Sequence, residues 1–220
     1  ATNTSDFYYV NQLRVSPNNS NIIYAATRTG IHKSDTSGNT WMNIASGIFS
    51  NRSGYLDLAV VNNGGIDYLY AWNSYYGLQV SIDGGNNWSY RIGGGVIASN
   101  NYYRGAIAIS QSDPGTAYVS VSTYSGRLYN LYKTTDYFTN VTTPITLDNS
   151  TAGRINAILL SNSYYSFDTG SGNNCAGGVS GDYNQGWYDN VIAVDPTNAN
   201  CVFVGGIDLF RSDNGGETFQ

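Results

Sequence analysis

A short turn motif that recurs along the chain constrains its fold more than any other feature. Each copy carries Ser or Thr immediately before an Asp or with one residue between them, and ends at an aromatic residue or at valine. The copies span Ser34–Trp41, Ser81–Trp88, Thr134–Val141 and Arg211–Phe219. The third copy is degenerate, because it lacks both glycines and ends in valine. Self-similarity of this kind predicts one supersecondary unit that is used repeatedly.

Short apolar strands and polar turns surround every copy of the motif. Each unit opens with a predicted strand, followed by a turn rich in Asn, Pro or Gly and by two further strands that lead into the motif. The first strands begin at Leu13, Leu58, Ile107 and Ile192. A fourth strand is expected to start at the residue that ends the motif. Because four short strands joined by tight turns make a β-propeller blade, we predict an all-β propeller of about four to five four-stranded blades.

The unit spacing predicts a single propeller domain over residues 1–220. The repeat units fall at approximately 7–52, 53–101, 102–154 and 155–220, and the last holds a long loop at 164–186. The sequence stops at Gln220, where the fourth strand of a blade is expected to begin. The propeller is therefore expected to be incomplete. Either the chain is a fragment of a longer protein, or another chain completes the last blade by strand exchange. Ala1–Val10 is the candidate donated strand, and such exchange would build a homo-oligomer or filament.

The composition limits the kinds of partner that the chain is expected to bind. Charged residues make up only 11% of the 220 residues, and the formal net charge is −5. A weakly charged acidic chain lacks the basic surface that nucleic acids and anionic membranes attract, so neither partner is expected. The sequence contains no apolar run long enough to cross a membrane as a helix. The low charge together with abundant Tyr (20), Asn, Ser and Thr is typical of a secreted or cell-surface β protein.

Two cysteines, Cys175 and Cys201, lie in the last third of the chain. A disulfide between them would add roughly 3 kcal/mol to the free energy of unfolding by restricting the unfolded chain. The alternative is a pair of buried free thiols. With a single histidine, His32, the cysteines cannot build a structural zinc site, and we expect no metal or cofactor.

The motif copies SIDGGNNW (81–88) and RSDNGGETF (211–219) resemble the Asp box, S-x-D-x-G-x-x-W, of the BNR/Asp-box β-propellers. This family includes sialidases, xyloglucanases and sortilin-type receptors, and the resemblance extends over almost the whole chain. Since the family holds enzymes and non-enzymes alike, the resemblance implies a fold and not an activity.

The resemblance implies that the motif residues are structural. The Asp carboxylate is expected to accept backbone N–H groups across the turn, and the glycines to adopt positive φ. The terminal aromatic ring is expected to pack against a neighbouring blade. The candidate structural residues are Ser34, Asp35, Trp41, Ser81, Asp83, Trp88, Asp136, Ser212, Asp213 and Phe219.

Aromatic pairs share one position in three of the four units, just before the first strand. Rigid aromatic faces with few charges suit sugar stacking or a protein contact. The alternative is that the pairs pack between blades as part of the core. The candidate binding residues for a glycan or an extracellular protein are Tyr8, Tyr9, Tyr102, Tyr103, Trp187 and Tyr188, and the second unit has Ser53 and Gly54 there.

The sequence offers weaker candidates for catalysis than for binding. Glycosidases generally use two carboxyl groups roughly 5–10 Å apart. Asp57 and Asp189, which precede first strands, form the best acid/base pair, and the alternative is that both are solvated loop carboxylates. Neither the arginine-containing segment of sialidases nor a G-x-S-x-G nucleophile motif is present. We therefore predict a secreted, non-enzymatic module for extracellular binding or structure, and the alternative is a fragment of a glycoside hydrolase of the xyloglucanase or sialidase kind.

Several N-x-S/T sequons occur, about as many as chance predicts for so much Asn, Ser and Thr. They are candidate attachment sites for N-linked glycans in a host that adds them. Their asparagines are Asn3, Asn18, Asn51, Asn87, Asn140 and Asn149.

Overall fold

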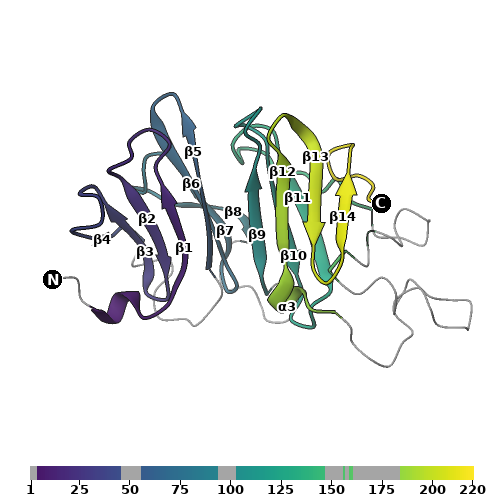
Figure 1. The fold of residues 1–220 in the computed structure, drawn as a ribbon, viewed down its shortest axis with the longest axis horizontal. Helices are drawn as coiled ribbons and strands as arrows, with labels where there is room; N and C mark the ends of the chain where they lie inside the picture. The colour runs from purple at the N-terminus through teal and green to yellow at the C-terminus, as the bar shows by residue number, and fades with distance from the viewer. Residues whose placement is uncertain (1–3, 46–55, 94–102, 147–155, 157–158, 161–183) are drawn as a thin grey trace, which may run out of the picture. The chain divides into compact units, whose positions relative to one another are not determined.

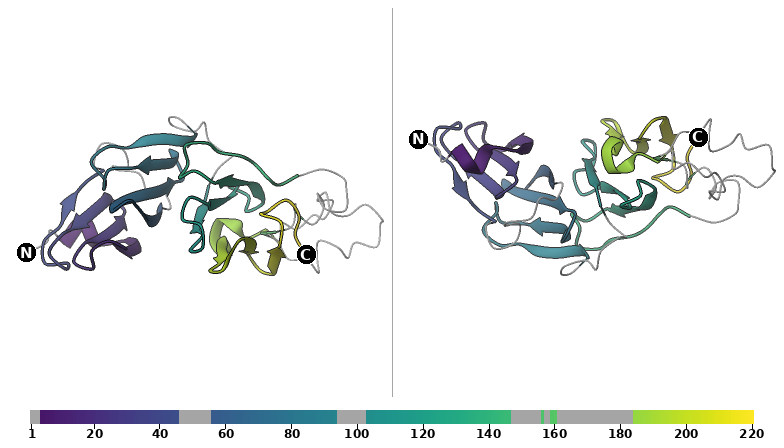
Figure 2. Two further views of the ribbon diagram at one scale, coloured as in Figure 1. Left: turned by 90° about the horizontal axis from the view of Figure 1, so that it is seen from above. Right: turned by 90° about the horizontal axis from the view of Figure 1, so that it is seen from below.

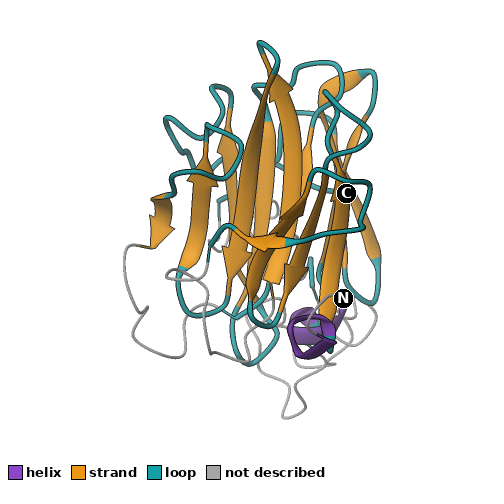
Figure 3. Cartoon of the chain, turned by 90° about the vertical axis from the view of Figure 1, so that its left-hand side faces the viewer, coloured by secondary structure: helices purple, strands orange, loops and turns teal. Residues whose placement is uncertain are grey.

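The computed structural model describes residues 4–45, 56–93, 103–146, 156, 159–160 and 184–220 (Figure 1). This part of the chain is built from β-strands with very little helix (Figure 3). The strands form four antiparallel sheets, each made from strands that are consecutive in the sequence. The prediction of an all-β chain of blade-like sheets is therefore confirmed.

The chain divides into two compact units, Ala1–Ile97 and Ala98–Gln220. In the first unit a 3-10 turn, η1 (Thr4–Phe7), leads into the first strand. The first sheet has the order β1 (Val10–Val15), β2 (Ile23–Thr27), β3 (Gly30–Ser34) and β4 (Met42–Asn43). The second sheet has the order β5 (Leu56–Asn63), β6 (Ile66–Asn73), β7 (Gly77–Ser81) and β8 (Ser89–Gly93).

The second unit also contains two sheets. One is formed by β9 (Gly105–Ile109), β10 (Ala117–Ser122) and β11 (Leu128–Thr134). The other is formed by β12 (Val191–Asp195), β13 (Asn198–Gly205) and β14 (Leu209–Ser212), and the short helix α3 (Gly186–Asp189) precedes it.

Both sheets of the second unit show the beginning of a fourth strand. Lys133 and Thr142 form an isolated antiparallel bridge beside β11. Arg211 and Gln220 exchange two backbone hydrogen bonds, of 3.0 and 2.9 Å, beside β14. The same strand–turn–strand step joins Lys33 to Met42 in the first sheet, so all four sheets follow one plan.

The hydrophobic core of each unit lies between its two sheets. In the first unit β1 lies next to β5, and Tyr24, Leu58 and Leu69 are among the side chains that fill the interface. In the second unit β12 lies next to β9 (Figure 2), and its core includes Leu131 and Val202. Burying apolar side chains on facing sheets stabilises the pair by removing their surface from water.

A buried carboxylate joins the two sheets of the first unit. Asp67, at the start of β6, accepts hydrogen bonds from Tyr24 Oη at 2.8 Å, Ser16 Oγ at 2.9 Å and Asn18 Nδ2 at 2.6 Å. Burial and the neighbouring Asp67 raise the pKa of Tyr24, so its hydroxyl stays protonated and remains a donor. Three donors on one carboxylate offset much of the cost of burying it.

The second unit repeats this tyrosine contact with a different acceptor. Tyr118 Oη, on β10, donates to the carbonyl oxygen of Ala199 at 2.9 Å. Burial and the charge of Asp113 raise the pKa of Tyr118 to about 12. A lysine amine lies over each ring, Lys33 at 5.7 Å from the centre of Tyr24 and Lys133 at 5.5 Å from that of Tyr118.

Four repeat turns join the third strand of each sheet to the fourth, and they span Ser34–Trp41, Ser81–Trp88, Thr134–Val141 and Ser212–Phe219. In every turn the first-position hydroxyl accepts the backbone N–H of the fifth residue. The N···O distances are 2.8 Å at Gly38 and 2.9 Å at Gly85, Phe138 and Gly216.

The third position of each repeat turn accepts a second backbone N–H, from the seventh position. Asp83 and Asp136 do so at 2.9 Å each. In the other two turns the acceptors are Thr36 Oγ1, at 2.9 Å, and Asn214 Oδ1, at 3.0 Å. A hydroxyl and an amide oxygen replace the carboxylate there, because the geometry requires an acceptor and not a charge.

This register corrects the prediction for Asp35 and Asp213. Each lies one position earlier in its turn than the capping residue. Asp35 is exposed, and Asp213 instead accepts a hydrogen bond from Arg211 Nε at 2.9 Å. Trp41 and Trp88 end their turns as predicted, and each indole N–H donates to the fifth residue's carbonyl oxygen, at 3.0 and 3.2 Å.

The third repeat turn keeps the backbone of the others without their glycines. Its fourth and fifth residues, Tyr137 and Phe138, have φ angles of 59° and 62°. The corresponding residues of the second turn are Gly84 and Gly85, at 71° and 95°. Side chains with a Cβ are disfavoured in this region, so the third turn is locally strained.

Candidate functional site

Aromatic side chains gather at one end of the sheets in the second unit, where β9 and β12 begin and β10 ends. Tyr103 precedes β9, Tyr124 lies in the β10–β11 turn, and Trp187 and Tyr188 lie in α3, the short helix that Figure 1 labels. We call these four residues the second-unit aromatic surface. Tyr124 is 70% exposed, Trp187 48% and Tyr188 67%. Large apolar side chains left in water at a sheet end are candidates for a contact surface.

The rings of this surface contact one another in pairs. Tyr103 and Tyr124 meet edge to face, with ring centres 5.2 Å apart and planes at 85°. Trp187 and Tyr188 have ring centres 5.8 Å apart and planes at 55°. Such pairs prefer these arrangements over stacked sandwiches, and each contact restricts the movement of both rings.

Two glycines bring the pairs together. The N–H of Gly186 donates to the carbonyl oxygen of Gly126 at 2.9 Å, which joins α3 to the β10–β11 turn. A Cβ on Gly126 would lie 2.8 Å from Trp187 Cδ1 and 2.6 Å from the carbonyl oxygen of Asn184. Only glycine allows Trp187 to lie against this turn, so the β10–β11 turn supports both ring pairs.

Polar contacts fix α3 and the start of β12 to the neighbouring sheet. Arg104 donates a guanidinium N–H to the carbonyl oxygen of Tyr188. Asn190 is buried, and its amide donates to the carbonyl oxygens of Ser120, at 2.8 Å, and Arg104, at 3.1 Å. Its Oδ1 accepts the Ser120 hydroxyl at 2.8 Å. A binding surface that is held in this way loses little conformational entropy when a ligand arrives.

The first unit has an exposed aromatic pair at the corresponding repeat position. Tyr8 is 74% exposed and Tyr9 61%, and both directly precede β1. The guanidinium of Arg28 lies over the Tyr9 ring, 5.6 Å from its centre. The backbone N–H of Arg28 donates to the Tyr9 carbonyl oxygen at 3.1 Å. We call Tyr8, Tyr9 and Arg28 the first-unit aromatic surface.

A ring contact anchors the chain just before this pair. The Phe7 ring lies 5.1 Å from that of His32 and 5.2 Å from that of Trp41. His32 is buried, and its Nε2 is 3.0 Å from Thr29 Oγ1. Burial lowers the pKa of His32, although the charge of Asp6 opposes the shift.

The structure therefore exposes Tyr8, Tyr9, Trp187 and Tyr188, and it leaves Tyr103 half-buried. The alternative of core packing does not describe the four exposed residues. Tyr102 lies outside the described residues, as do Ser53 and Gly54. Sequence reasoning missed Tyr124, although the turn between second and third strands always reaches the sheet end at which the first strand begins.

The two catalytic candidates fall in different units. Asp57 is the second residue of β5, where it is buried and accepts the Leu58 N–H at 2.9 Å. Asp189 is half-buried at the end of α3. No cluster of His, Cys, Asp and Glu that could bind a metal ion occurs among the described residues.

Cys201 is a free, buried thiol on β13. The predicted disulfide is not found, and the other cysteine, Cys175, lies outside the described residues. Burial raises the pKa of the Cys201 thiol, so the side chain behaves as a small apolar group of the core.

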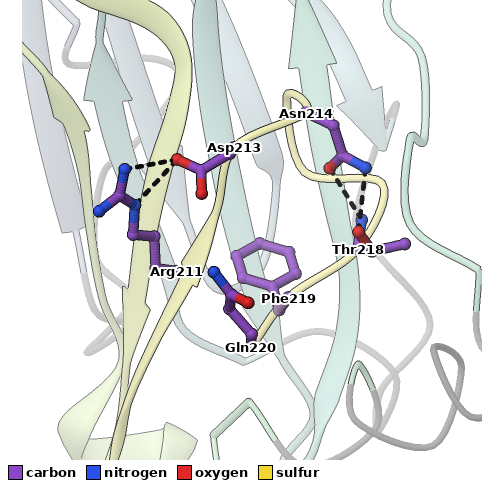
Figure 4. Close-up of a pocket in the computed structure, with 6 residues that line it drawn as sticks. All are labelled: Arg211, Asp213, Asn214, Thr218, Phe219 and Gln220. Carbon is purple, nitrogen blue, oxygen red and sulfur yellow. Dashed lines mark hydrogen bonds and ion pairs between the residues drawn. The ribbon is translucent and has the colours of Figure 1, made fainter.

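A cavity of about 270 Å³ lies beside β14 at the fourth repeat turn (Figure 4). Its polar side chains pair with one another. Arg211 forms an ion pair of 2.7 Å with Asp213, and Asn214 Nδ2 donates to Thr218 Oγ1 at 2.9 Å. The cavity is lined by Arg211, Asp213, Asn214, Thr218, Phe219 and Gln220. The cavity lies at the strand edge, and the side chains of Arg211, Asp213, Asn214 and Thr218 have structural partners.

The three sequon asparagines in the described residues have structural partners. In each, the side-chain amide donates to a carboxylate at 2.6 or 2.7 Å. The pairs are Asn18 with Asp67, Asn87 with Asp83 and Asn140 with Asp136. Asn3, Asn51 and Asn149 lie outside the described residues.

Comparison with known proteins identifies the fold. No protein-family model matches the chain, and no curated protein matches it in sequence. Among solved structures, the Niastella koreensis GH74 enzyme is similar, with a TM-score of 0.59 and 22% identity over 94% of this chain. The extracellular domain of BT4673 from B. thetaiotaomicron (TM-score 0.52, 15% identity over 96% of the chain) and YCF48 from Cyanidioschyzon merolae (0.50, 15%, 96%) are also similar.

These neighbours have the propeller fold, and at such low identity they support the fold alone. The chain corresponds to 28% of the length of the GH74 enzyme, 21% of BT4673 and 55% of YCF48. The four antiparallel sheets and these similarities together define an all-β propeller architecture. Within the described residues, no helix has the length and apolar character needed to span a bilayer.

Proposed function

We propose that this chain is part of an extracellular Asp-box β-propeller that binds glycans through the second-unit aromatic surface. One observation carries the proposal. Tyr124, Trp187 and Tyr188 are exposed, and backbone and amide contacts hold the surface in place. Aromatic faces stack on the apolar C–H faces of sugar rings, and the phenol and indole edges add hydrogen bonds.

The repeat turns support the Asp-box assignment. All four share the first-position hydroxyl bond, the third-position acceptor and two consecutive positive-φ residues. A common backbone in copies of different sequence is expected of a repeat family. On this assignment residues 1–220 belong to one propeller domain.

The composition supports the extracellular setting and the neutral ligand. Only 11% of the residues are charged, so steering by net charge contributes little to partner choice. A neutral or weakly charged glycan fits such a surface better than an ionic ligand does. A protein partner remains the competing occupant, because aromatic residues with Arg are also common at protein interfaces.

A glycan array tests the proposal. We expect the wild-type chain to bind a subset of glycans, and the Trp187→Ala variant to lose about tenfold or more in affinity, since tenfold corresponds to only about 1.4 kcal/mol. The matched control is Tyr90→Ala, because Tyr90 is an exposed aromatic residue on β8, outside both aromatic surfaces. Equal binding by all three chains, or binding to no glycan, would contradict the proposal.

A glycoside hydrolase fragment is the second candidate, and the similarity to the GH74 enzyme favours it. In that case Asp189, the more exposed of the two predicted carboxylates, is the candidate acid or base. The test is the release of reducing sugar from bound polysaccharides, compared between the wild type and Asp189→Asn. Binding without release in the wild type favours the non-enzymatic module.

A further inference from the structure

We propose that the chain associates with a second copy of itself through a contact between the β12–β14 sheet of one copy and the β1–β4 sheet of the other. This contact repeats the packing that joins neighbouring sheets within each unit. Each contact face belongs to a single sheet, so the contact needs no particular arrangement of the two units within a chain. The inference goes beyond the proposed function, because it requires no glycan.

A cation over an aromatic ring recurs at one cross-strand position, where the second strand of a sheet pairs with the third. The cation lies 5.5 to 5.8 Å from the ring centre in each case. The three pairs are Tyr24 with Lys33, Tyr118 with Lys133 and Phe203 with Arg211. Because directly paired residues share a face of an antiparallel sheet, each pair identifies one face of its sheet.

In two of the three sheets the pair contacts the sheet that follows in the sequence. Lys33 Nζ donates to the carbonyl oxygen of Gly84, in the second repeat turn, at 3.4 Å. Lys133 Nζ donates to Asn200 Oδ1, on β13, at 3.3 Å. The tyrosine hydroxyls of both pairs donate to the same neighbouring sheets. The face that carries the pair is therefore the face on which the next sheet packs.

The Phe203–Arg211 pair lies on the corresponding face of the β12–β14 sheet, where apolar side chains are left in water. An apolar residue lies two positions before each cation and shares its face, since side chains alternate along a strand. Ile31 and Leu131 are 0% and 1% exposed there, whereas Leu209 is 70% exposed. The outer face of the β12–β14 sheet comprises Val191, Ala193, Phe203, Leu209 and Arg211.

The β1–β4 sheet presents the complementary face, on which a preceding sheet would pack. Leu13 is 56% exposed on this face. The corresponding first-strand residues, Leu58 and Ile192, are 0% and 8% exposed, because they pack against the preceding sheet of their unit. Val15 shares the face of Leu13 and is also 56% exposed. Both faces therefore leave apolar side chains in water at positions that sheet packing covers elsewhere in the chain.

The first repeat turn is uncovered on the same side of the β1–β4 sheet. A Cβ on Gly85 would lie 2.3 Å from Ile44, and one on Gly216 would lie 2.6 Å from Leu131, both side chains of the preceding repeat. The same atom on Gly38 would have its nearest neighbours 3.9 Å away, in its own sheet. Among the described residues, the fifth position of the turn thus meets a neighbouring sheet in the second and fourth repeat turns but not in the first.

The same face also carries the acceptor that the cation requires. Lys133 bonds to Asn200, whose carbonyl oxygen accepts the N–H of the fourth residue of its repeat turn at 2.8 Å. Asn21 accepts the corresponding N–H in the first repeat turn at 2.9 Å, and it is exposed. A guanidinium has five N–H donors, so the ion pair of Arg211 with Asp213 leaves donors for Asn21 of the second copy.

A second copy fits the outer face because each chain carries both halves of the contact. The halves differ, so the contact is head-to-tail, and each copy retains one free half that allows a row of copies or a closed ring. Phe7 lies on the face of Leu13, against His32 and Trp41, and it leaves the β1 side of that face exposed. Burying Leu13 and Leu209 in one interface removes apolar surface from water, which favours association.

Light scattering after size exclusion tests the contact on the full chain. Leu209→Asp places a carboxylate on the outer face of the β12–β14 sheet, and Leu13→Asp places one on the opposing face. Ile66→Asp is the control, because Ile66 is 48% exposed and lies on neither face. The unfolding temperature of each variant reports whether it is folded, and Leu209→Ser or Leu13→Ser replaces a variant that is not.

We expect the wild type and Ile66→Asp to reach about twice the single-chain mass or more as their concentration rises, and Leu209→Asp and Leu13→Asp to remain at the single-chain mass. An equimolar mixture of these two variants should recover about twice the single-chain mass. The mixture associates because Leu13→Asp supplies an intact outer face and Leu209→Asp supplies an intact opposing face.

Three results would overturn the inference. If the wild type stays at the single-chain mass at every concentration, the faces do not associate between copies. If Leu209→Asp associates as the wild type does, another surface joins the copies. If Leu13→Asp forms dimers by itself, the outer face pairs with its own counterpart. Glycan binding is measured separately with Trp187→Ala, so either proposal can fail without the other.

Discussion

Asp136 and Asn140 are joined twice across the third repeat turn. Asp136 Oδ1 accepts the Asn140 backbone N–H at 2.9 Å, and Oδ2 accepts the Asn140 side-chain amide at 2.6 Å. Asp83 and Asn87 repeat this pair of contacts in the second turn, at 2.9 and 2.7 Å. Both partners of this contact lie within the turn, so the contact stabilises the turn without help from the rest of the chain.

This contact predicts a loss of stability in acid. The hydrogen bonds from Asn140 hold the pKa of Asp136 below its ordinary value of 3.8. Because the pKa is lower in the folded state than in the unfolded one, the carboxylate's contribution is complete above about pH 4 and is lost as the pH falls through the folded-state value. Thermal unfolding between neutral pH and about pH 2 should show the loss.

Asp136→Asn is the matched variant. We expect it to unfold with a free energy at most about 1 kcal/mol lower at neutral pH, because Asn214 fills the same position in the fourth turn. Its unfolding temperature should depend less on pH below about pH 4 than that of the wild type. Parallel curves for the two chains would show that Asp136 does not carry the acid sensitivity.

The strained third turn predicts different losses of stability for two neighbouring glycine substitutions. Tyr137→Gly relieves a positive φ of 59° at a half-buried side chain, so we expect a change within about 1 kcal/mol. Phe138→Gly relieves a φ of 62°, but it removes a fully buried ring and should cost about 3 kcal/mol or more. Denaturant unfolding of both variants measures the difference, and similar losses would mean that burial of Phe138 contributes little.

Gly126→Ala should perturb the second-unit aromatic surface by steric collision. Its Cβ would lie 2.6 Å from the Asn184 carbonyl oxygen and 2.8 Å from Trp187. Gly65→Ala is the control, because Gly65 has a similar φ, 87° against 84°, and no atom within 4 Å of a new Cβ. We expect the control to lose about 1 kcal/mol from backbone strain, and Gly126→Ala to lose clearly more and to weaken glycan binding. Equal unfolding and binding in the two variants would contradict the packing of Trp187 on the turn.

Asn190→Asp should destabilise the second unit more than Ser120→Ala does. The Asn190 amide donates to two carbonyl oxygens in a buried position, and a carboxylate there would face both oxygens with no donor. We expect a loss of about 3 kcal/mol for Asn190→Asp and about 1 kcal/mol for Ser120→Ala, which removes a single hydroxyl donor. Chemical denaturation measures both, and equal losses would mean that Asn190 is less critical than its contacts indicate.

The free thiol of Cys201 predicts indifference to reducing agents. We expect the unfolding temperature of the wild type to be the same with and without dithiothreitol, and the same in Cys175→Ser. Burial should also keep Cys201 unreactive towards thiol reagents until the chain unfolds. A fall of several degrees on reduction would instead reveal a stabilising disulfide.

The comparison of sequence and structure separates the local features from the long-range ones. The strands, the repeat turns and their order were predictable, because a strand's alternation and a turn's hydroxyl and glycine residues act within a few positions. The capping residue was harder to predict. Asp35 and Thr36 are adjacent in sequence, and only the bond from Gly38 N–H to Ser34 Oγ establishes that Thr36 is the third position.

The sequence by itself determined that this chain is an all-β repeat protein with aromatic residues before several first strands. Only the tertiary structure decided which of those residues meet. Tyr124 lies beside Tyr103, and Trp187 beside Gly126, because β10 ends, and α3 and β12 begin, at the same sheet end across long sequence separations. The tertiary structure also decided which side chains are exposed, because segments distant in the sequence cover some side chains and leave others in water.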